Sequence, residues 1–515
     1  MRPSRRCRDQ EYFDKKEEVS GSTYEQGTRK AVGYPVMLPR DSSSVDTHQN
    51  ASSITTTNDA RAAEQKPFSV IPTNGCQVLG SCASDETLLT AWRSFALVSL
   101  DTIDRLLDTY MEAIYPVFPV FHWPNFRERV AKREFLVDRN LFASVMGACA
   151  LVRAQEPHSA GHVPSNSSHH EQDRLTESFF LAASDAIPRD PSSAHGLHYL
   201  RASGLLAWAA LHHGHIAVMQ EYLGRFWTLS WAAHFADESK WPQNITLTEK
   251  EEYRRLFWSV YTLDLLAVIV YGKTTSVEDA NVHVEYPTQT DDAHITDSSY
   301  ISNDEPSWLQ GWNFVLDLTR ALAHDVIQHR RSHGTVYNSG RSWLRSRAFE
   351  PPNADNVVVS AIAWYHRMPL QFKSNVTQAT TANLEAHLFN VQAVRIQFAI
   401  QLLCATVCFS DNGLDIHRKF DNAEELLSFM HGVNDRLSQA AMLPFAHFYA
   451  AVFRQFVNDL GPLITTNLRE RARSIIETMR VHLRNSEPLC YGAASLLRDL
   501  QSSLRRLDLV SHGQD

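Results

Sequence analysis

Histidine and cysteine are the side chains of this sequence most suited to hold a metal ion or to act as a nucleophile. The 515 residues contain 24 His and seven Cys. His212, His213 and His215 crowd a predicted helix end, and a second group of histidines occupies a Ser-rich stretch over residues 158–170. Zinc needs ligands that converge on one point, usually with cysteine or carboxylate among them. We therefore interpret both groups as solvated, at a helix end and in a loop, and predict no metal site.

The cysteines are odd in number and widely spaced, which is unlike a disulfide framework and typical of a reducing compartment. Cys404 and Cys408 lie four residues apart in an apolar run, so they share one helix face. Buried free thiols behave as small hydrophobic groups, and we predict that this pair belongs to the core. The complete set is Cys7, Cys76, Cys82, Cys149, Cys404, Cys408 and Cys490.

Short catalytic signatures are absent from the sequence. It has no G-x-S-x-G nucleophile elbow, no H-E-x-x-H zinc motif, no P-loop and no G-x-G-x-x-G turn after a strand. We therefore expect a protein that is not an enzyme. An all-α enzyme assembled from scattered residues stays open as an alternative, and a cavity between helices with two or more converging carboxylates or histidines would favour it.

The charge balance gives little support to direct nucleic-acid binding. The formal net charge is −9, whereas a nucleic-acid-binding domain usually carries a basic field that neutralises phosphates. A weakly basic stretch exists only at residues 1–16. The longest nearly apolar run, Phe398–Phe409, is shorter than the roughly 20 residues that span a bilayer. No secretory signal precedes it, so the sequence predicts a soluble intracellular protein without a membrane partner.

The composition divides the chain at about residue 86. Residues 1–86 lack helical periodicity and are rich in Ser, Thr and Asn in their second half, so they cannot bury enough apolar surface to offset the entropy of ordering. We expect a disordered N-terminal arm there, with a weakly basic tip. One helical domain is expected over residues 87–510.

Apolar residues in this second part recur with the period of amphipathic helices, and no strand alternation is found after residue 90. The sequence therefore predicts an all-α fold, a large irregular multi-helix domain. The first predicted helix contains Ile103–Ile114 and stops at Pro116. Later helices are expected at about 138–153, from about 172, and at 197–215, 216–235, 248–271, 309–331, 356–369, 383–409, 421–440, 441–459, 465–485 and 489–507.

Local signals refine these elements. Thr248 and Glu251 fit the capping pattern S/T-x-x-E at the start of the helix that Gly272 is expected to end. Small residues such as Gly204, in the helix pair before it, permit close helix packing. The stretch Tyr115–Phe126, YPVFPVFHWPNF, is aromatic and punctuated by prolines, which predicts an extended segment.

Two segments resemble the fungal-specific transcription factor domain, the middle homology region of zinc-cluster regulators. The first is YPVFPVFHWPNF, in which His-x-Pro-x-Phe closes an aromatic and Pro-rich motif. The second is Glu251–Pro287, with two basic residues, Leu-Phe-Trp, an aromatic residue, an Asp, a Gly and a Pro in the family's order. The motif core spans about residues 100–330. The matching residues are Tyr115, Pro119, His122, Pro124, Phe126, Arg254, Arg255, Leu256, Phe257, Trp258, Tyr261, Asp264, Gly272 and Pro287.

The resemblance implies a function as well as a fold. Such proteins act in the nucleus, and many control one metabolic or secondary-metabolite gene cluster. The helical domain would restrain or release an activating segment in response to a metabolite or a partner. The transcription machinery, a related factor or a second copy of the chain are the partners that the resemblance implies.

The family's DNA-binding module is not recognisable in the sequence. That module holds two zinc ions with six closely spaced cysteines. Cys7 stands alone, and Cys76 and Cys82 lie six residues apart without further thiols nearby. We therefore expect no cofactor in this chain, and zinc only if the predicted start of translation misses an upstream exon. The alternative is an adaptor or dimer partner of a complete zinc-cluster factor, which meets DNA weakly or through that partner.

The charged motif residues have two interpretations. Arg254 and Arg255, which precede a Phe-Trp pair, could contact nucleic acid through charge and stacking. We favour a structural role, in which the arginines pair with local carboxylates such as Glu251. Asp264 falls on the buried face of the same helix, so we expect it to have a partner within the domain.

Overall fold

The computed structural model describes residues 88–155, 168–277, 281–302, 305–333, 354–373, 384–410, 415–432 and 466–486, with single residues between 452 and 505. The predicted N-terminal arm, residues 156–167 of the histidine-rich loop, the side chains of His169 and His170, and all but single residues of the predicted helices 441–459 and 489–507 lie outside the described residues. The described part is helical and contains no strand, only two isolated β-bridges. The all-α prediction is confirmed.

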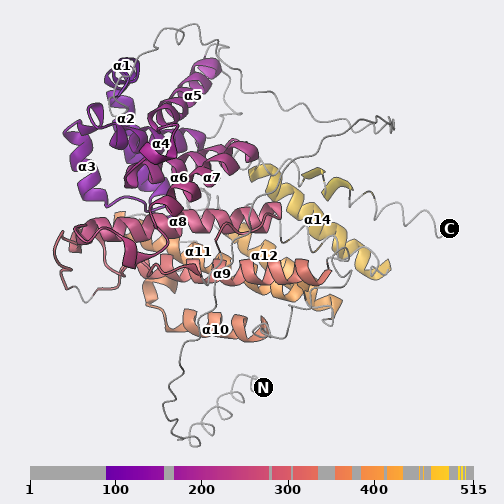
Figure 1. The fold of residues 1–515 in the computed structure, drawn as a ribbon. Coiled ribbons are helices and arrows are strands. Elements are labelled where there is room, and N and C mark those ends of the chain that lie inside the picture. Colours follow the sequence, from indigo (N-terminus) through magenta and orange to yellow (C-terminus); the bar gives the residue numbers. More distant parts are fainter. Residues whose placement is uncertain are drawn as a thin grey trace, which may run out of the picture. The chain divides into compact units, whose positions relative to one another are not determined.

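The first five helices gather around the fourth (Figure 1). They are α1 (Thr90–Val98), α2 (Leu100–Thr109), α3 (Trp123–Ala131), α4 (Arg139–Gln155) and α5 (Ser168–Ala186). The stretch Leu141–Val152 of α4 is buried without interruption, which is typical of a helix that is apolar on nearly all sides. It packs against α2, α5 and the helix α6 (Leu197–His212).

The middle of the chain supplies the helices that join the two halves of the described domain. α6 contacts α7 (Ile216–Ala232), and α8 (Leu247–Tyr271) contacts both α6 and α9 (Trp308–His333). The remaining helices are α10 (Ala354–Arg367), α11 (Leu384–Ser410), α12 (Ile416–Gly432) and α14 (Thr466–Ser486). α11 packs against α9, α10 and α12, and α14 packs against α12.

One helix of the described part, Leu384–Phe409 within α11, is long and apolar enough to cross a membrane by length and composition. Its environment accounts for that composition, because 78% of its most apolar 18-residue stretch is buried inside the domain. A helix that is enclosed on all sides needs no polar face. The apolar run predicted from the sequence spans only Phe398–Phe409, whereas the apolar helix begins earlier, at Leu384.

The predicted capping pair of α8 is wrong by two residues. The sequence fits the S/T-x-x-E pattern twice, and the helix uses the earlier pair. Thr246 Oγ1 accepts a hydrogen bond from the backbone N–H of Glu249 at 3.1 Å, and a Glu249 carboxylate oxygen accepts one from the Thr246 N–H at 2.8 Å. Thr248 and Glu251 are buried within the first turns instead.

The predicted extended segment Tyr115–Phe126 is wrong in its last part. α3 begins at Trp123, and Pro124 occupies its first turn, where the missing N–H would have had no helical partner. Pro-containing sequences of this kind therefore suit a helix start as well as an extended chain. The earlier part is irregular, and Tyr110 OH braces it by donating to the carbonyl oxygen of Phe118 at 2.8 Å.

Gly204 provides the close helix approach that its size predicted. A Cβ atom at this position of α6 would lie 2.7 Å from the Cγ2 of Val260 in α8, which is closer than real Cβ contacts. Gly224, in the next helix, is exposed, and a Cβ atom added there would have no neighbouring atom within 4 Å. The two glycines therefore separate the packing role of glycine from its effect on helix propensity.

We predict opposite effects of the same substitution at these two glycines. Gly204→Ala overpacks the α6–α8 contact and should lower the free energy of unfolding by about 1–3 kcal/mol. Gly224→Ala, the matched control, should raise it by about 0.5–1 kcal/mol, because alanine has less backbone entropy to lose. Urea unfolding followed by circular dichroism measures both. An equal gain from the two substitutions would contradict the close contact.

Candidate functional site

The two sequence motifs meet at a residue that belongs to neither, Asp292. Its side chain accepts a hydrogen bond from Tyr115 OH at 2.5 Å and one from the backbone N–H of Trp123 at 2.8 Å, both in the first motif. Arg255 of the second motif forms an ion pair with the other carboxylate oxygen at 2.5 Å. Asp292 therefore joins segments that lie more than 100 residues apart in the chain.

The pair Arg255–Asp292 is buried, and hydrogen bonds to Asp292 compensate for the loss of water on the acid side. Burial raises the pKa of the Asp292 carboxyl, but the charges of Arg255 and His122 and the bonds from Tyr115 and Trp123 outweigh it, so its pKa lies below the usual value. Arg255 is 0% exposed, and its Nε and Nη2 have no hydrogen-bond partner among the described residues. Asp292 is thus the acid on which the buried guanidinium depends.

A second buried arginine braces the first motif from α6. Arg201 is 0% exposed, donates to the carbonyl oxygen of Val120 at 2.7 Å and stands over the ring of Phe121 at 4.6 Å. It forms an ion pair with Glu252 at 3.1 Å, and Glu252 also accepts a hydrogen bond from the backbone N–H of His122 at 2.7 Å. The roles of Arg201 and Glu252 were not predicted from the sequence, although a single arginine inside the apolar run of α6 was a usable signal.

Arg254 points into a cluster of three glutamates. It donates to Glu238 at 2.7 Å and to Glu251 at 3.0 Å, and it also pairs with Glu285. The predicted pairing with Glu251 is therefore confirmed. Burial raises the pKa of the Glu238 carboxyl, but the hydrogen bonds from Arg254 and from the Glu285 backbone, together with the Arg254 charge, outweigh that effect, so its pKa lies below the usual value. Arg254 is 4% exposed, so this motif arginine cannot reach a phosphate in the described structure.

Asp264 has the internal partner that its buried position required. Its two carboxylate oxygens accept hydrogen bonds from Ser276, one from the backbone N–H at 2.9 Å and one from the hydroxyl at 2.8 Å. Burial nevertheless raises the pKa of the Asp264 carboxyl. Gly272 ends α8 in the left-handed conformation, with φ of 68°, and so turns the chain back toward Asp264. The sequence could place Asp264 inside but could not identify Ser276.

The aromatic residues of the second motif pack in the core around this network. Trp258 donates from its ring N–H to the carbonyl oxygen of Glu285 at 2.9 Å, and its ring meets that of Tyr286 edge-on at 4.8 Å. Arg320 of α9 lies over the Trp258 ring at 5.4 Å. The other motif residues that are buried are Tyr115, Pro119, His122, Phe126, Leu256, Phe257, Tyr261 and Pro287, whereas Pro124 and Gly272 are exposed.

The histidines and cysteines form no metal site within the described residues, where no group of three or more candidate ligands converges. The interpretation of His212 as solvated is wrong, since this side chain is 8% exposed and lies 3.3 Å from the Gln155 amide. Cys408 is buried and Cys404 partly buried, and burial raises the pKa of the Cys404 thiol to about 11. The predicted core position of this pair is confirmed for Cys408 and only partial for Cys404.

The segment of residues 286–289, which overlaps the end of the second motif, forms one wall of a cavity. Its backbone is fixed to the charge network, because the N–H of the preceding Glu285 donates to Glu238 at 2.8 Å and Thr288 N–H donates to Glu251 at 2.9 Å. The cavity measures about 740 Å³, and α9 and α10 supply most of its other walls. It is lined by Tyr286, Pro287, Thr288, Gln289, Gln310, Asn313, Phe314, Asp317, Leu318, Ala321, Val357, Ala361, Trp364, Met368 and Leu403.

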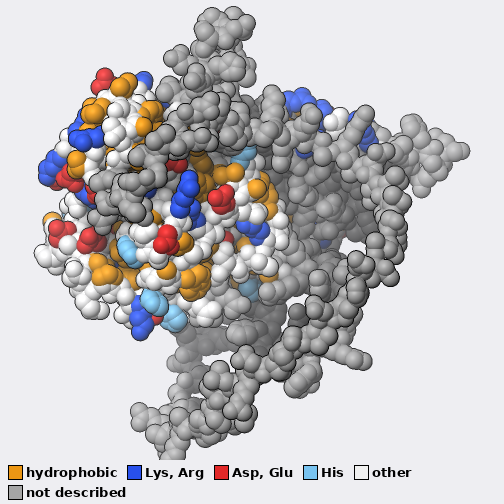
Figure 2. Space-filling view, turned by 45° about the horizontal axis from the view of Figure 1, so that its top comes forward, with side chains coloured by type: hydrophobic (Ala, Val, Ile, Leu, Met, Phe, Trp, Pro, Cys, Tyr) orange, Lys and Arg blue, Asp and Glu red, His pale blue; other side chains and the backbone are white. Residues whose placement is uncertain are grey.

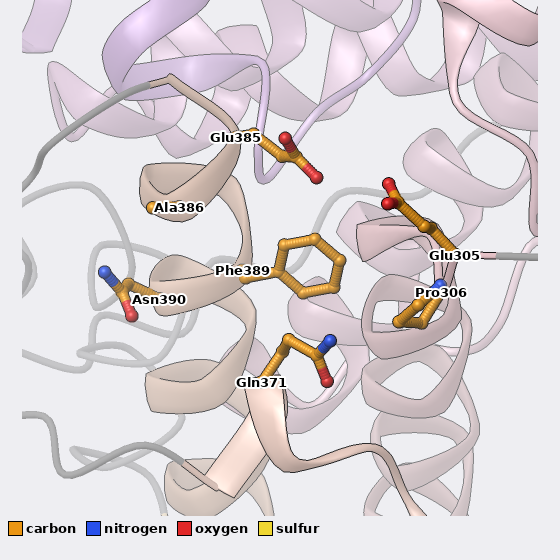
Figure 3. A pocket seen from close by; sticks show the side chains of 7 residues that line it. All are labelled: Glu305, Pro306, Gln371, Glu385, Ala386, Phe389 and Asn390. Atoms are coloured by element: carbon orange, nitrogen blue, oxygen red, sulfur yellow. The ribbon is translucent and has the colours of Figure 1, made fainter.

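A smaller hollow of about 480 Å³ lies at the start of α11 (Figure 3). Glu305 and Glu385 point toward each other across it, beside the ring of Phe389. Two facing carboxylates are the feature that would favour an enzyme, but both side chains are exposed. Catalytic acids are usually prepared by burial, which this hollow does not give. We therefore assign it no catalytic role.

The surface of the described part fits the overall charge. Figure 2 shows acidic, basic and apolar side chains interspersed on one face, without a broad basic field among the residues described there. The arginines of the second motif do not contribute, because Arg254 and Arg255 are buried. The phosphate-contacting interpretation of these arginines is therefore not supported by the fold.

Comparison with known proteins gives one family and one relative. A family model described as "Fungal specific transcription factor domain" matches residues 107–390, which is more than half of the chain. The transcriptional activator protein acu-15 of Neurospora crassa is 24% identical over 130 residues, which cover 25% of this chain and 13% of that protein. The match thus spans a small part of the relative's length. No solved structure matches the chain.

The network predicts a large cost for removing its central acid. Asp292→Asn leaves the buried Arg255 charge without a counter-ion and should lower the free energy of unfolding by about 3–5 kcal/mol. Asp108, which pairs with Arg127 at 3.0 Å on the surface, is the matched control, and Asp108→Asn should cost less than about 1 kcal/mol. Urea unfolding measures both. Equal, small losses would show that Asp292 is not the link we describe.

The same pair predicts a pH dependence. The pKa of Asp292 is lower in the folded chain than in the unfolded one, so its stabilisation is present above the unfolded pKa of about 4 and is lost as the pH falls through the folded pKa. The difference in unfolding free energy between the wild type and Asp292→Asn should therefore be constant above about pH 5 and shrink as the pH falls below about 4. A difference that also stays constant below about pH 4 would show that the Asp292 charge is not responsible.

Proposed function

Because this chain belongs to the family of the fungal-specific transcription factor domain, we propose that it is a nuclear transcription regulator that controls a metabolic or secondary-metabolite gene cluster. The observation that carries the proposal is the junction at Asp292. Residues of both sequence motifs contact Asp292 in one buried network. The whole network lies inside residues 107–390, the region that the family model matches. The name of the Neurospora relative, a transcriptional activator, agrees with it.

The domain would act as a regulatory scaffold and not as a DNA-contacting surface. Its most family-like arginines, Arg254 and Arg255, are buried and serve the fold. A net charge of −9 also disfavours tight binding to phosphates. In this proposal the helical domain engages the transcription machinery or a related factor, including a second copy of the chain. Its role is non-catalytic, in keeping with the family.

A second candidate, an adaptor that pairs with a complete zinc-cluster factor, is favoured by the cysteines. Three of the seven, Cys149, Cys404 and Cys408, are built into α4 and α11. Four thiols remain among the 515 residues, whereas a two-zinc cluster uses six. In this candidate, contact with DNA is made by the partner. In the first candidate it is made by a zinc module encoded outside this sequence.

Gene deletion tests the regulatory proposal. We expect that removing the gene changes transcript levels of a contiguous set of metabolic genes several-fold, measured by RNA sequencing. Reintroduction of the wild-type chain should restore them, and the destabilised variant Asp292→Asn should not. Unchanged transcripts after deletion, under conditions in which the chain is expressed, would refute the proposal.

Sequencing the 5′ end of the transcript separates the two candidates. Upstream codons in frame with closely spaced cysteine pairs would remove the adaptor candidate. A transcript that starts at Met1 would support it, and chromatin occupancy of the tagged chain should then disappear when its DNA-binding partner is deleted.

A further inference from the structure

We propose that the 740 Å³ cavity between α9, α10 and residues 286–289 binds a neutral, largely apolar small molecule that carries one hydrogen-bond donor at its polar end. The regulatory meaning of such a ligand rests on the proposed function, whereas its binding does not. Ligand cavities in proteins typically measure about 300–1,000 Å³ and combine apolar walls with a few polar groups. This cavity has both properties.

The helices present one continuous face each to the cavity. The lining residues of α9 recur as Gln310, Asn313, Phe314, Asp317, Leu318 and Ala321, a spacing that keeps them on one side of the helix. On α10 and the residue after it, Val357, Ala361, Trp364 and Met368 do the same. The cavity is therefore a feature of two helix faces and not an accident of one side chain.

The charges around the cavity favour a neutral ligand. Among the described lining residues only Asp317 is charged, and it is already engaged, since Tyr286 OH donates to it at 2.6 Å and Arg320 lies 3.9 Å away. An anionic ligand would find no basic side chain in these walls. A buried charge without a partner is costly, so both carboxylates and ammonium groups should be rejected.

The polar groups are gathered at one end. Gln289, Gln310 and Asn313 come from the short segment and from the first turns of α9, whereas the α10 wall is apolar. Asn313 is 6% exposed, and its Nδ2 donates to the carbonyl oxygen of Pro287 at 2.8 Å, which fixes the orientation of the amide. Its Oδ1 has no hydrogen-bond partner among the described residues. An unsatisfied acceptor at the wall favours a ligand with a hydroxyl or N–H donor.

Aromatic side chains favour a ring system as the apolar part of the ligand. Phe314 lies in the α9 wall and Trp364 in the α10 wall, and Trp364 as a whole residue is 60% exposed. An exposed tryptophan beside a cavity can cover a ligand by stacking its ring on an aromatic part of that ligand. Trp364 is therefore the residue that we expect to lose exposure on binding.

A matched set of naphthalene probes tests the chemistry on the full-length chain. β-Naphthol is neutral and carries a donor, its methyl ether lacks the donor, and β-naphthoate and β-naphthylmethylamine carry opposite charges. We expect quenching of tryptophan fluorescence by β-naphthol with a measurable Kd, binding by the ether weaker by about five- to tenfold, and weaker binding still by both charged analogues. Equal affinity of the four probes, or tighter binding of a charged one, would overturn the proposal.

Two alanines of α10 provide the matched variants. Ala361→Phe fills the cavity from a buried position and should weaken β-naphthol binding at least about tenfold. Ala363→Phe adds the same ring on the exposed side of the helix, outside the lining, and should leave the Kd within about twofold. Circular dichroism checks that both variants are folded. Unchanged binding in a folded Ala361→Phe chain would place the probe elsewhere and overturn the assignment.

Trp364→Ala serves if Ala361→Phe fails to fold, because this exposed side chain can be removed without opening the core. Binding should weaken severalfold, now followed by calorimetry, and unchanged affinity would count against the site. Failure of these binding tests leaves the transcript experiment untouched. If transcripts respond to gene deletion but β-naphthol binding is insensitive to the cavity variants, the regulatory function stands and the ligand site falls.

Discussion

The buried pair Arg255–Asp292 is the interaction on which the rest of the described domain depends. Two opposite charges removed from water stabilise a fold only if their geometry is good and their remaining hydrogen-bonding groups are occupied. The chain meets this condition on the acid side, where Tyr115 and the backbone of Trp123 donate to Asp292. The start of α3, the middle of α8 and the turn at residues 292–294 are thereby held in one arrangement. The aromatic residues and prolines of the first motif form part of the surface that encloses this pair.

The network also gives the second motif a structural meaning. Arg254 and Arg255 are adjacent in sequence but point to different acids, Arg254 to a cluster of glutamates and Arg255 to Asp292. Successive residues of a helix project about 100° apart, so one helix turn can address two separate loops. α8 thus lies at the centre of the network. Its charged side chains form ion pairs and hydrogen bonds with the segment after Gly272 and, through Asp292, contact the first motif. Because the arginines of the second motif are used inside the fold in this way, they are not available to bind ligands at the surface.

The sequence predicted the parts of this arrangement that are local. The pair Arg254–Glu251 is three residues apart on one helix, and helical periodicity brings such neighbours together. Asp264 could be placed inside because it interrupts an apolar face. Asp292, Glu252 and Arg201 could not be assigned, because their partners come from distant segments and nothing in a single sequence records which loop returns to which helix. The prediction of the α8 cap was wrong for a different reason. The sequence contains two overlapping capping patterns, and the later pair, Thr248 and Glu251, is buried in the fold and does not cap the helix.

The placement of α11 has a consequence for where this domain can be divided. The family match stops at residue 390, but α11 continues to Ser410. Gln392, two residues after the end of the family match, is fully buried. Its side-chain amide donates to the carbonyl oxygen of Pro116, in the first motif, at 2.7 Å. A chain cut at residue 390 would therefore lack Gln392, and the carbonyl oxygen of Pro116 in the first motif would lose this hydrogen bond. The region that the family model matches is thus shorter than the set of helices that encloses the first motif.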